Sequence, residues 1–296
     1  MRAFLEGLYL VYNRRELVNP DPLAFLYEYD DPLDREIAGL VASCLAYGRV
    51  AQILKSVGKV LSPLGRRPHR FLLRGRLPEG LFGDFRHRFT TGKQVRELLI
   101  RVSEVLRSHG SLEAFMKQCA RDGDFLEALN LFSRELSPSK ESFPSEEAPL
   151  REGRSARGSA GGFSLLAAPE NGSACKRLAL YLKWMVRRDE VDPGGWTVFS
   201  PRDLLVPTDT HMHGIALRLG LTARKQADLK TALEITRAFA RFCPEDPARY
   251  DFALTRFGIR GALRTAELAD LYFGGLVLSC PPAGLSRANR VIIDAE

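Results

Sequence analysis

The stretch 173-SACKRLALYLKWMVRR-188 gives the clearest indication of the fold, because it predicts a helix with a lysine in its first turn. The preceding 169-PENG-172 is a strong turn signal, and Ser173 is a candidate helix cap. The positive end of the helix dipole disfavours an ammonium ion there, whereas a nucleophilic lysine must be a neutral amine. Lys176 is therefore a candidate nucleophile, and an ordinary surface lysine is the alternative.

A second stretch, 206-VPTDTHMHGIALRLGL-221, predicts a helix that starts directly after Asp209. Its apolar residues fall on one face, as in an amphipathic helix. Aspartate is a preferred N-cap residue, so the structural interpretation is that Asp209 stabilises the helix start. A capping carboxylate with an exposed oxygen can also act in catalysis as a fixed negative charge, so Asp209 is a candidate catalytic residue.

The rest of the chain also follows a helical period. Asp31 and Pro32 mark the start of a helix over 33–47, which ends before Gly48. Runs of alternating β-branched residues are missing, and Val291–Ile293 is the best strand candidate. These patterns predict an all-α protein. Further helices are expected over 94–106, 176–186, 210–219, 229–242 and 247–257.

Composition divides the chain into three parts. Residues 137–172 contain Ser, Gly, Pro and mixed charge, which is typical of a flexible surface insertion or linker, with an active-site lid as the alternative. They separate a basic helical region, 1–136, from a helical region, 173–296, that contains Lys176 and Asp209. In a chain of 296 residues, the two helical regions are expected to form one two-lobed unit with a cleft between the lobes.

Positive charge is concentrated in one segment. The net charge is +7 and the sequence pI is about 9.3, which favours an anionic partner. Between Lys55 and Arg107 there are thirteen Lys or Arg and four Asp or Glu, and this excess of nine exceeds the charge of the whole chain. A phosphate backbone requires such a concentrated surface, while solvated helix faces are the alternative. Arg66, Arg67 and Arg70 are the candidate DNA contacts of this segment.

Cysteine usage and hydropathy limit the class of protein. The five cysteines stand singly, without a Cys-x-x-Cys pair, so neither a metal site nor an iron–sulfur cofactor is expected. Single cysteines without a signal peptide are typical of a reducing, cytoplasmic setting. No apolar run approaches the length of a membrane span. We expect a monomeric cytoplasmic protein that is associated with the nucleoid and not with a membrane.

The order of these features resembles the endonuclease III-like helix-hairpin-helix DNA glycosylases. Both have a turn, a helix with an early lysine, and a later V-x-x-D-T-H at a helix start; the family's lysine and aspartate fall on Lys176 and Asp209. The wider chain is similar to a bacterial family with the motifs ACKRL, WMVR, PxDTH and DPxxYDFAL. Here these motifs are Ala174–Leu178, Trp184–Arg187, Pro207–His211 and Asp246–Leu254.

Departures from the glycosylase pattern change what the resemblance implies. Pro169–Cys175 replaces the usual L-P-G-x-G, so the hairpin is degenerate and Gly172 alone provides a flexible turn. Lys176 and Asp209 are 33 positions apart, which is longer than in the endonuclease III branch and closer to archaeal 8-oxoguanine glycosylases. The C-terminal cluster cysteines of the endonuclease III branch are absent. The resemblance therefore implies a cofactor-free enzyme for an oxidised purine. It also implies DNA contacts by Gly172, Ser173 and Arg177.

The reaction that the resemblance implies is base-excision repair of damaged double-stranded DNA. The enzyme flips the damaged base into a pocket, and neutral Lys176 attacks C1′ of the sugar. Asp209 stabilises the positive charge on the sugar or relays a proton. The resulting Schiff base permits β-elimination, which is the lyase activity. Trp184, Trp196 and His211 are candidates for contacts with the flipped base, and core packing is the alternative for both tryptophans.

Two other classes of protein remain open. The degenerate hairpin favours a non-catalytic DNA-binding module on the same scaffold. The segment 208-TDTHMH-213 suggests a metal-dependent hydrolase, because two histidines two residues apart face one side of a strand. The barrel that such a motif opens needs far more than the residues that follow His213. We therefore expect His211 to make a structural hydrogen bond and His213 to face the surface.

Overall fold

The protein is almost entirely helical in a computed structural model that describes residues 1–121, 123–137 and 165–259. Helices account for 60% and strands for 3% of the structure, which confirms the prediction of an all-α class. In the described part of the chain, five 3₁₀ turns (Arg15–Leu17, Pro22–Glu28, Ser62–Leu64, Pro169–Asn171 and Pro201–Asp203) connect the helices. The α-helices are α1 (Arg2–Tyr12), α2 (Pro32–Cys44), α3 (Val50–Leu61), α4 (Pro68–Leu73), α5 (Gly92–His109), α6 (Leu112–Cys119), α7 (Phe125–Leu136), α8 (Lys176–Val186), α9 (Thr210–Arg218), α10 (Leu229–Ala240) and α11 (Asp251–Ile259).

The helix starts follow the caps that the sequence contains. Asp31 accepts a hydrogen bond from the backbone N–H of Leu33, and Pro32 is the first residue of α2. Thr91 and Gln94 form a reciprocal capping box at the start of α5. Helix α8 spans Lys176–Val186, as the apolar period predicts. Local hydrogen bonding therefore determines where these helices begin.

A short β-hairpin interrupts the helical chain. Strands β1 (Arg86–His87) and β2 (Thr90–Thr91) pair antiparallel, with Arg86 opposite Thr91 and His87 opposite Thr90. The sequence analysis did not predict this hairpin. Strands of two residues are too short to produce a recognisable alternation of apolar and polar side chains. The strand candidate Val291–Ile293 lies outside the described residues.

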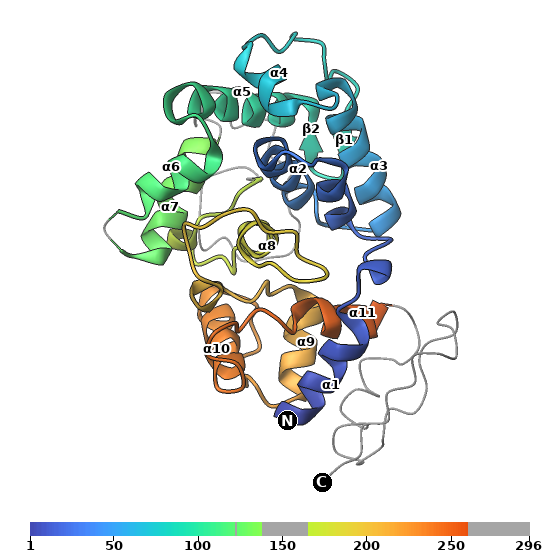
Figure 1. Ribbon diagram of the computed structural model, residues 1–296, viewed down its shortest axis with the longest axis vertical. Helices are drawn as coiled ribbons and strands as arrows, with labels where there is room; N and C mark the ends of the chain where they lie inside the picture. Colours follow the sequence, from blue (N-terminus) through green and yellow to red (C-terminus); the bar gives the residue numbers. More distant parts are fainter. Residues whose placement is uncertain (122, 138–164, 260–296) are drawn as a thin grey trace.

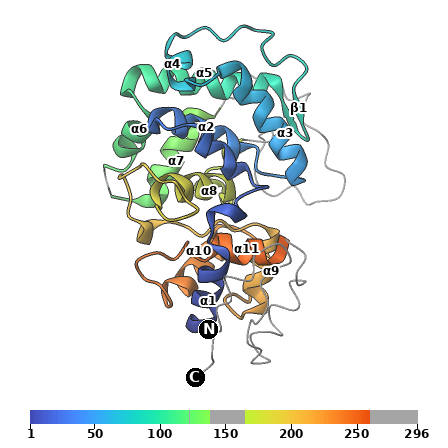
Figure 2. The same ribbon diagram turned by 45° about the vertical axis from the view of Figure 1, so that its right-hand side comes forward.

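Helix α8 is the central element of the molecule. In Figures 1 and 2 it lies between a group formed by α2 to α6 and a group formed by α1, α9, α10 and α11. Eight of its residues are buried, including Tyr181, Trp184 and Met185, so packing surrounds most of the helix. Residues at its N-terminal end are therefore held on a rigid element. Among the described residues, no helix has both the length and the apolar character needed to cross a membrane.

The N-terminal helix belongs in space to the C-terminal group of helices. Helix α1 packs against α11, where the hydroxyl of Tyr250 donates a hydrogen bond to Glu6. Arg249 lies 3.3 Å from the same carboxylate. Region 1–136 is therefore divided in space, because α1 lies with α9 to α11 while α2 to α6 lie on the other side of α8 (Figure 1).

The end of the expected linker is packed and ordered by specific contacts. Leu165 and Leu166 are buried, and the hydroxyl of Ser133 donates to the carbonyl of Leu166 at 2.8 Å. Glu170 forms an ion pair with Arg134 on α7. Segment 165–172 is thus part of the folded structure, which corrects the expectation of a flexible segment as far as residue 172. Residues 138–164 lie outside the described part of the chain.

Candidate functional site

The turn before α8 positions Lys176. Gly172 and Cys175 both have left-handed backbones, with φ of 70° and 49°. The carbonyl of Gly172 accepts a hydrogen bond from the N–H of Leu229 at 3.0 Å, which joins the turn to the start of α10. Cys175 is the N-cap of α8 and makes no side-chain cap bond with the helix. Lys176 is therefore the first residue of α8, at the positive end of its dipole.

Two expectations about this turn need correction. Ser173 does not cap α8; its hydroxyl accepts a hydrogen bond from the N–H of Cys175 at 3.2 Å. Gly172 does not provide the turn alone, because Cys175 also adopts a conformation that L-residues rarely adopt.

Burial raises the pKa of the Cys175 thiol to about 12, so this cysteine is not a thiolate nucleophile.

Lys176 and Asp209 form an ion pair between α8 and α9. Oδ1 of Asp209 accepts hydrogen bonds from the N–H groups of His211 and Met212, both at 2.9 Å. Oδ2 lies 3.1 Å from Nζ of Lys176. The lysine ammonium also donates to the carbonyl of Ala46 at 3.2 Å. One oxygen of Asp209 therefore caps α9, as the structural interpretation predicts, and the other contacts the lysine.

The charge of Asp209 is stabilised despite partial burial. Burial raises the pKa of this carboxyl, but Lys176 and the backbone N–H of Met212 more than offset that effect and hold the pKa below its ordinary value. The side chains of Lys176 and Asp209 are 31% and 25% exposed, so a ligand can reach both. A positioned amine next to a persistent carboxylate can act on an electrophilic carbon and on the positive charge that develops there.

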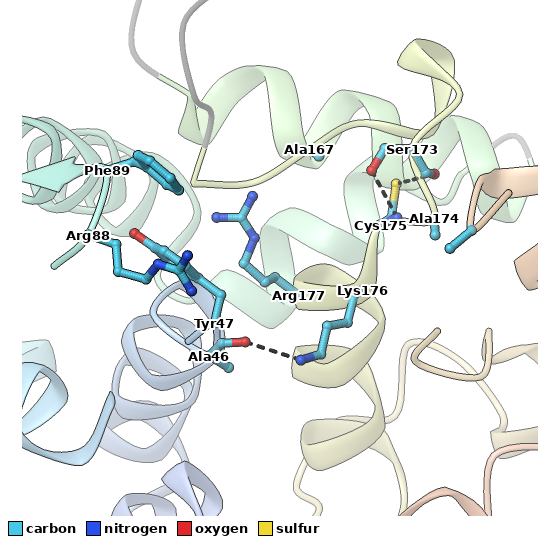
Figure 3. Close-up of a pocket in the computed structure, with 11 residues that line it drawn as sticks. Ala46, Tyr47, Arg88, Phe89, Ala167, Ser173, Ala174, Cys175, Lys176 and Arg177 are labelled. Carbon is cyan, nitrogen blue, oxygen red and sulfur yellow. Dashed lines mark hydrogen bonds between the residues drawn. The ribbon is translucent and has the colours of Figure 1, made fainter. Parts of the chain in front are cut away.

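A cavity of about 360 Å³ opens beside Lys176 (Figure 3). Among the described residues that line it, three are cations and none is a carboxylate, so the cavity favours an anionic or electron-rich ligand. The residues that line it are Ala46, Tyr47, Arg88, Phe89, Ala167, Ser173, Ala174, Cys175, Lys176, Arg177 and Ala227.

Arg177 and Tyr47 form the centre of the cavity wall. The guanidinium carbon of Arg177 lies 5.6 Å from the centroid of the Tyr47 ring, within cation–π range. Nη1 of Arg177 donates to the carbonyl of Cys44 at 3.5 Å. Burial lowers the pKa of this guanidinium. The resemblance implied Arg177 as a contact residue. Tyr47, Arg88 and Phe89 were not predicted, because the hairpin and the end of α2 approach α8 only in the tertiary structure.

A buried network of charges lies toward the other end of α8. Nζ of Lys183 is 3.0 Å from Asp192 and 3.6 Å from Asp251. Arg187, one turn later, is 2.9 Å from Asp246 and also pairs with Asp192. Arg187 lies in the WMVR motif and Lys183 directly before it, and Asp246 and Asp251 lie in the DPxxYDFAL motif, whereas Asp192 lies outside both. The motif positions therefore contribute ion pairs to the interior as well as residues to the site.

Asp251 is a member of this network that interacts electrostatically with both Asp209 and Lys176. Burial raises the pKa of its carboxyl to about 6, Lys183 opposes that rise, and the Asp209 carboxylate adds to it. The buried Asp251 carboxylate and the partly exposed Lys176–Asp209 pair are thus electrostatically connected. Periodicity alone did not identify Lys183, although a charged residue in a helix that is apolar on most sides is a recognisable signal of a buried ion pair.

Both tryptophans lie in the core and not in the cavity wall. Trp184 is 2% exposed and Trp196 is 4% exposed. Nε1 of Trp196 donates to Glu36 at 3.1 Å, and its ring meets Tyr181 edge to face at 5.1 Å. Burial raises the pKa of Glu36 to about 7, partly offset by hydrogen bonds from the backbone of Leu112. The alternative of core packing therefore describes both tryptophans in this structure.

The two histidines have the reverse of their expected positions. His211 is exposed near Asp209, whereas His213 is buried and its Nε2 lies 2.7 Å from the carbonyl of Arg224. The segment forms helix α9, so residues two apart do not share a face as they do in a strand. Among the described residues, no group of three or more His, Cys, Asp or Glu side chains is arranged to hold a metal ion. The geometric argument for a metal-dependent hydrolase therefore fails.

The predicted arginine contacts lie away from the cavity. Arg66, Arg67 and Arg70 are exposed at or just before α4. Helix α4 lies at the end of the molecule opposite α9 and α10 in both views, while α8 lies at the middle (Figures 1 and 2). A ligand that contacts Lys176 and these arginines together must therefore extend over the α2–α6 side of the molecule.

The fold and the site define an all-α protein in which a lysine–aspartate pair borders a basic cavity. A family model described as "Protein of unknown function (DUF2400)" matches residues 21–260, and the chain belongs to this family. No curated protein and no solved structure matches the chain.

Proposed function

We propose that the protein is a DNA glycosylase of base-excision repair that also cleaves the strand through a Schiff base. The observation that carries this proposal is the Lys176–Asp209 ion pair beside a cavity with three cations. The resemblance of the chain to helix-hairpin-helix glycosylases assigns the same two residues. The 33-residue interval between them favours an oxidised purine, such as 8-oxoguanine, as the damaged base.

The proposed reaction exchanges one bond at the sugar for another. Nζ of Lys176 transfers a proton to Asp209 as the damaged base enters the cavity, and the free amine attacks C1′. The glycosidic bond breaks as the bond from Nζ to C1′ forms, and the base leaves with the electron pair and takes the proton from Asp209. The carboxylate that this restores stabilises the positive charge on the sugar and on the attached nitrogen. The C1′–O4′ bond then breaks, O4′ takes up a proton from that nitrogen, and a protonated Schiff base forms. Transfer of a C2′ proton to a base then expels the 3′ phosphate, which leaves with the electron pair of its C–O bond.

Positive groups around the cavity provide the proposed DNA contacts. Arg88 and Arg177 line the cavity with Lys176, and the N-terminus of α8 adds backbone N–H groups that suit a phosphate. Gly172 and Ser173 lie in the turn that approaches the same end of α8. Double-stranded DNA is the substrate in this proposal, because a damaged base must leave the stack to reach the cavity.

Borohydride trapping tests the covalent step. Duplexes that carry a panel of oxidised bases or an abasic site are incubated with the protein and borohydride, which reduces a Schiff base to a stable adduct. We expect an adduct with the wild type and none with Lys176→Gln, while DNA affinity stays nearly unchanged. Lys230→Gln is the matched control, because Lys230 is an exposed lysine on α10. A peptide map that places the adduct on another lysine would contradict the assignment of Lys176.

A non-catalytic DNA-binding module is the second candidate. The observation that favours it is that Lys176 bridges Asp209 and the carbonyl of Ala46, which joins α8, α9 and the end of α2. In that case Lys176 is a structural residue. Duplex binding without an adduct or base release across the whole panel would support this candidate and contradict the enzyme.

A further inference from the structure

The β-hairpin presents an exposed aromatic ring at the edge of the cavity. The turn between β1 and β2 consists of Arg88 and Phe89, and both line the cavity beside Lys176 (Figure 3). Phe89 is 46% exposed. Among the described residues, the other large apolar side chains that are exposed are leucines, so Phe89 is the aromatic one. Arg88 has a φ of 50°, a left-handed backbone that a long side chain rarely adopts. The turn therefore keeps a costly conformation that displays an apolar ring to solvent.

Buried hydrogen bonds fix the hairpin to the same residue that forms the cavity wall. The ring of His87 is fully buried, with Nε2 3.0 Å from the carbonyl of Tyr47 and Nδ1 2.9 Å from the hydroxyl of Ser56. The hydroxyl of Tyr47 in turn donates to the carbonyl of His87 at 2.8 Å and lies 2.6 Å from Oγ1 of Thr90. Since a carbonyl only accepts, Nε2 carries the ring hydrogen and Nδ1 accepts from Ser56.

These bonds hold the hairpin in a defined position relative to Lys176. Burial lowers the pKa of His87, so the ring stays neutral and keeps this hydrogen-bond pattern at physiological pH. The tip of the hairpin is thus preorganised, and Phe89 does not need to move with a flexible loop to reach a ligand in the cavity.

We propose that Phe89 inserts into the base stack of DNA beside the nucleotide that enters the cavity. A base that leaves the duplex leaves a gap, and an inserted apolar side chain restores the stacking contacts that its neighbours lose. Arg88 and Arg177, which both lie next to Tyr47 in Figure 3, face the phosphates next to the extruded nucleotide in this proposal. This inference rests on the DNA-binding part of the proposed function and adds a residue that opens the duplex.

Equilibrium binding to two duplexes of the same sequence tests this inference. One duplex is intact, and the other contains a central tetrahydrofuran abasic-site analogue, in which the gap already exists. We expect the wild type to bind the tetrahydrofuran duplex more tightly. Phe89→Ala should weaken binding to that duplex by about tenfold or more, as for the loss of an aromatic stacking partner. Binding to the intact duplex should change less than about twofold, because non-specific binding depends mainly on phosphate contacts.

Two further variants separate insertion from a general loss of apolar surface. Phe89→Trp should keep the preference for the tetrahydrofuran duplex, since a larger ring can still stack. Leu131→Ala is the matched control: Leu131 is 39% exposed on α7 and does not line the cavity, so its loss should leave both affinities unchanged. Thermal unfolding should show that all three variants remain folded.

The outcomes distinguish this inference from the proposed chemistry. Equal weakening of both duplexes by Phe89→Ala, no weakening, or a wild type without preference for the tetrahydrofuran duplex would overturn the insertion. If the wild type forms a borohydride adduct while Phe89→Ala binds like the wild type, the insertion fails and the glycosylase stands. If the preference depends on Phe89 but no lesion yields an adduct or base release, the glycosylase fails and the insertion stands.

Discussion

Lys176 and Lys183 lie two turns apart on one face of α8, and their surroundings differ. Lys176 is 31% exposed and pairs with one carboxylate beside a cavity. Lys183 is 1% exposed and lies between Asp192 and Asp251 in the interior. The first pair costs less desolvation than the second and leaves the amine within reach of a ligand, whereas the second must be fully compensated by its partners. One helix thus carries a candidate reactive group at its exposed end and a structural ion pair at its buried end.

The largest expected effect is on Lys183. Lys183→Met should destabilise the protein by about 3–5 kcal/mol, because it leaves Asp192 and Asp251 buried without their main partner. Chemical denaturation measures the free energy of unfolding, and Lys176→Gln serves as the comparison, with an expected loss below about 1 kcal/mol. Similar losses for the two variants would remove the contrast between the ends of α8.

Asp209→Asn should have the largest effect on the proposed reaction. Asparagine also caps helices, so α9 should remain folded. The negative charge beside Lys176 is lost, and base release should fall by about 10²-fold or more. Single-turnover kinetics on the best lesion duplex measure this loss. Unchanged base release in a folded variant would show that Asp209 acts only as a cap.

Much of this contrast depends on tertiary contacts that local patterns do not specify. The caps at Asp31 and Asp209 are local, and so the starts of α2 and α9 could be predicted. Helix α5 starts at Gly92, two residues before the predicted 94–106, because Thr91 caps it. The apolar period also predicted α8 correctly. In contrast, the left-handed Cys175 depends on how the turn approaches α8, and the periodicity did not suggest it.

The candidate site was predicted in part for the same reason. Lys176, Asp209 and Arg177 could be identified from their sequence neighbourhood, and the structure brings Lys176 and Asp209 within 3.1 Å. The hairpin residues Arg88 and Phe89 could not be identified from their sequence neighbourhood. Strand β1 is held by contacts of His87 with Ser56 and Tyr47, which lie 31 and 40 positions away. The two tryptophans were candidates for contacts with the flipped base because an indole ring stacks well on a base. Both rings are buried in the core in this structure and do not line the cavity.

The variant Trp196→Phe tests whether Trp196 stabilises the core or contributes to the proposed reaction. The variant loses the Nε1 hydrogen bond to Glu36, while the backbone N–H of Leu112 still contacts that carboxylate. We expect a loss of stability of about 1–2 kcal/mol and an unchanged yield of borohydride adduct per folded molecule. A large fall in adduct yield without loss of stability would indicate that Trp196 contacts the substrate.

Charge reversal on α4 tests whether the DNA surface extends beyond the cavity. In the triple variant Arg66→Glu, Arg67→Glu and Arg70→Glu, the slope of log affinity against log salt should decrease in magnitude by about 2–3, since each lost phosphate contact removes about 0.9. The same reversal at three exposed arginines of the opposite group should have little effect; these control positions are Arg218, Arg237 and Arg241. Equal effects of the two triple variants would show that α4 is not a specific contact.

The smallest expected effect is the pH dependence of the Lys176–Asp209 pair. The pKa of Asp209 in the folded protein lies below its ordinary value of 3.8, so ionised Asp209 favours the folded state. This contribution is present above the unfolded pKa and is lost as pH falls through the folded pKa. The difference in unfolding free energy between the wild type and Asp209→Asn should therefore be below about 1 kcal/mol at pH 7 and should disappear in acid. A difference that grows below pH 3.8 would contradict this assignment.

The contact between α1 and α11 has a consequence for how the protein assembles during synthesis. Leu5 and Leu8 on α1 are fully buried, and Glu6 contacts Tyr250, 244 positions later in the chain. At roughly 5–20 residues per second, α11 leaves the ribosome on the order of ten seconds or more after α1. The apolar face of α1 therefore lacks its native partner α11 during this interval, while α2 to α8 are already available to fold. At this end of the molecule the order of synthesis and the order of burial are opposed, because α1 is made well before the helix that completes its packing.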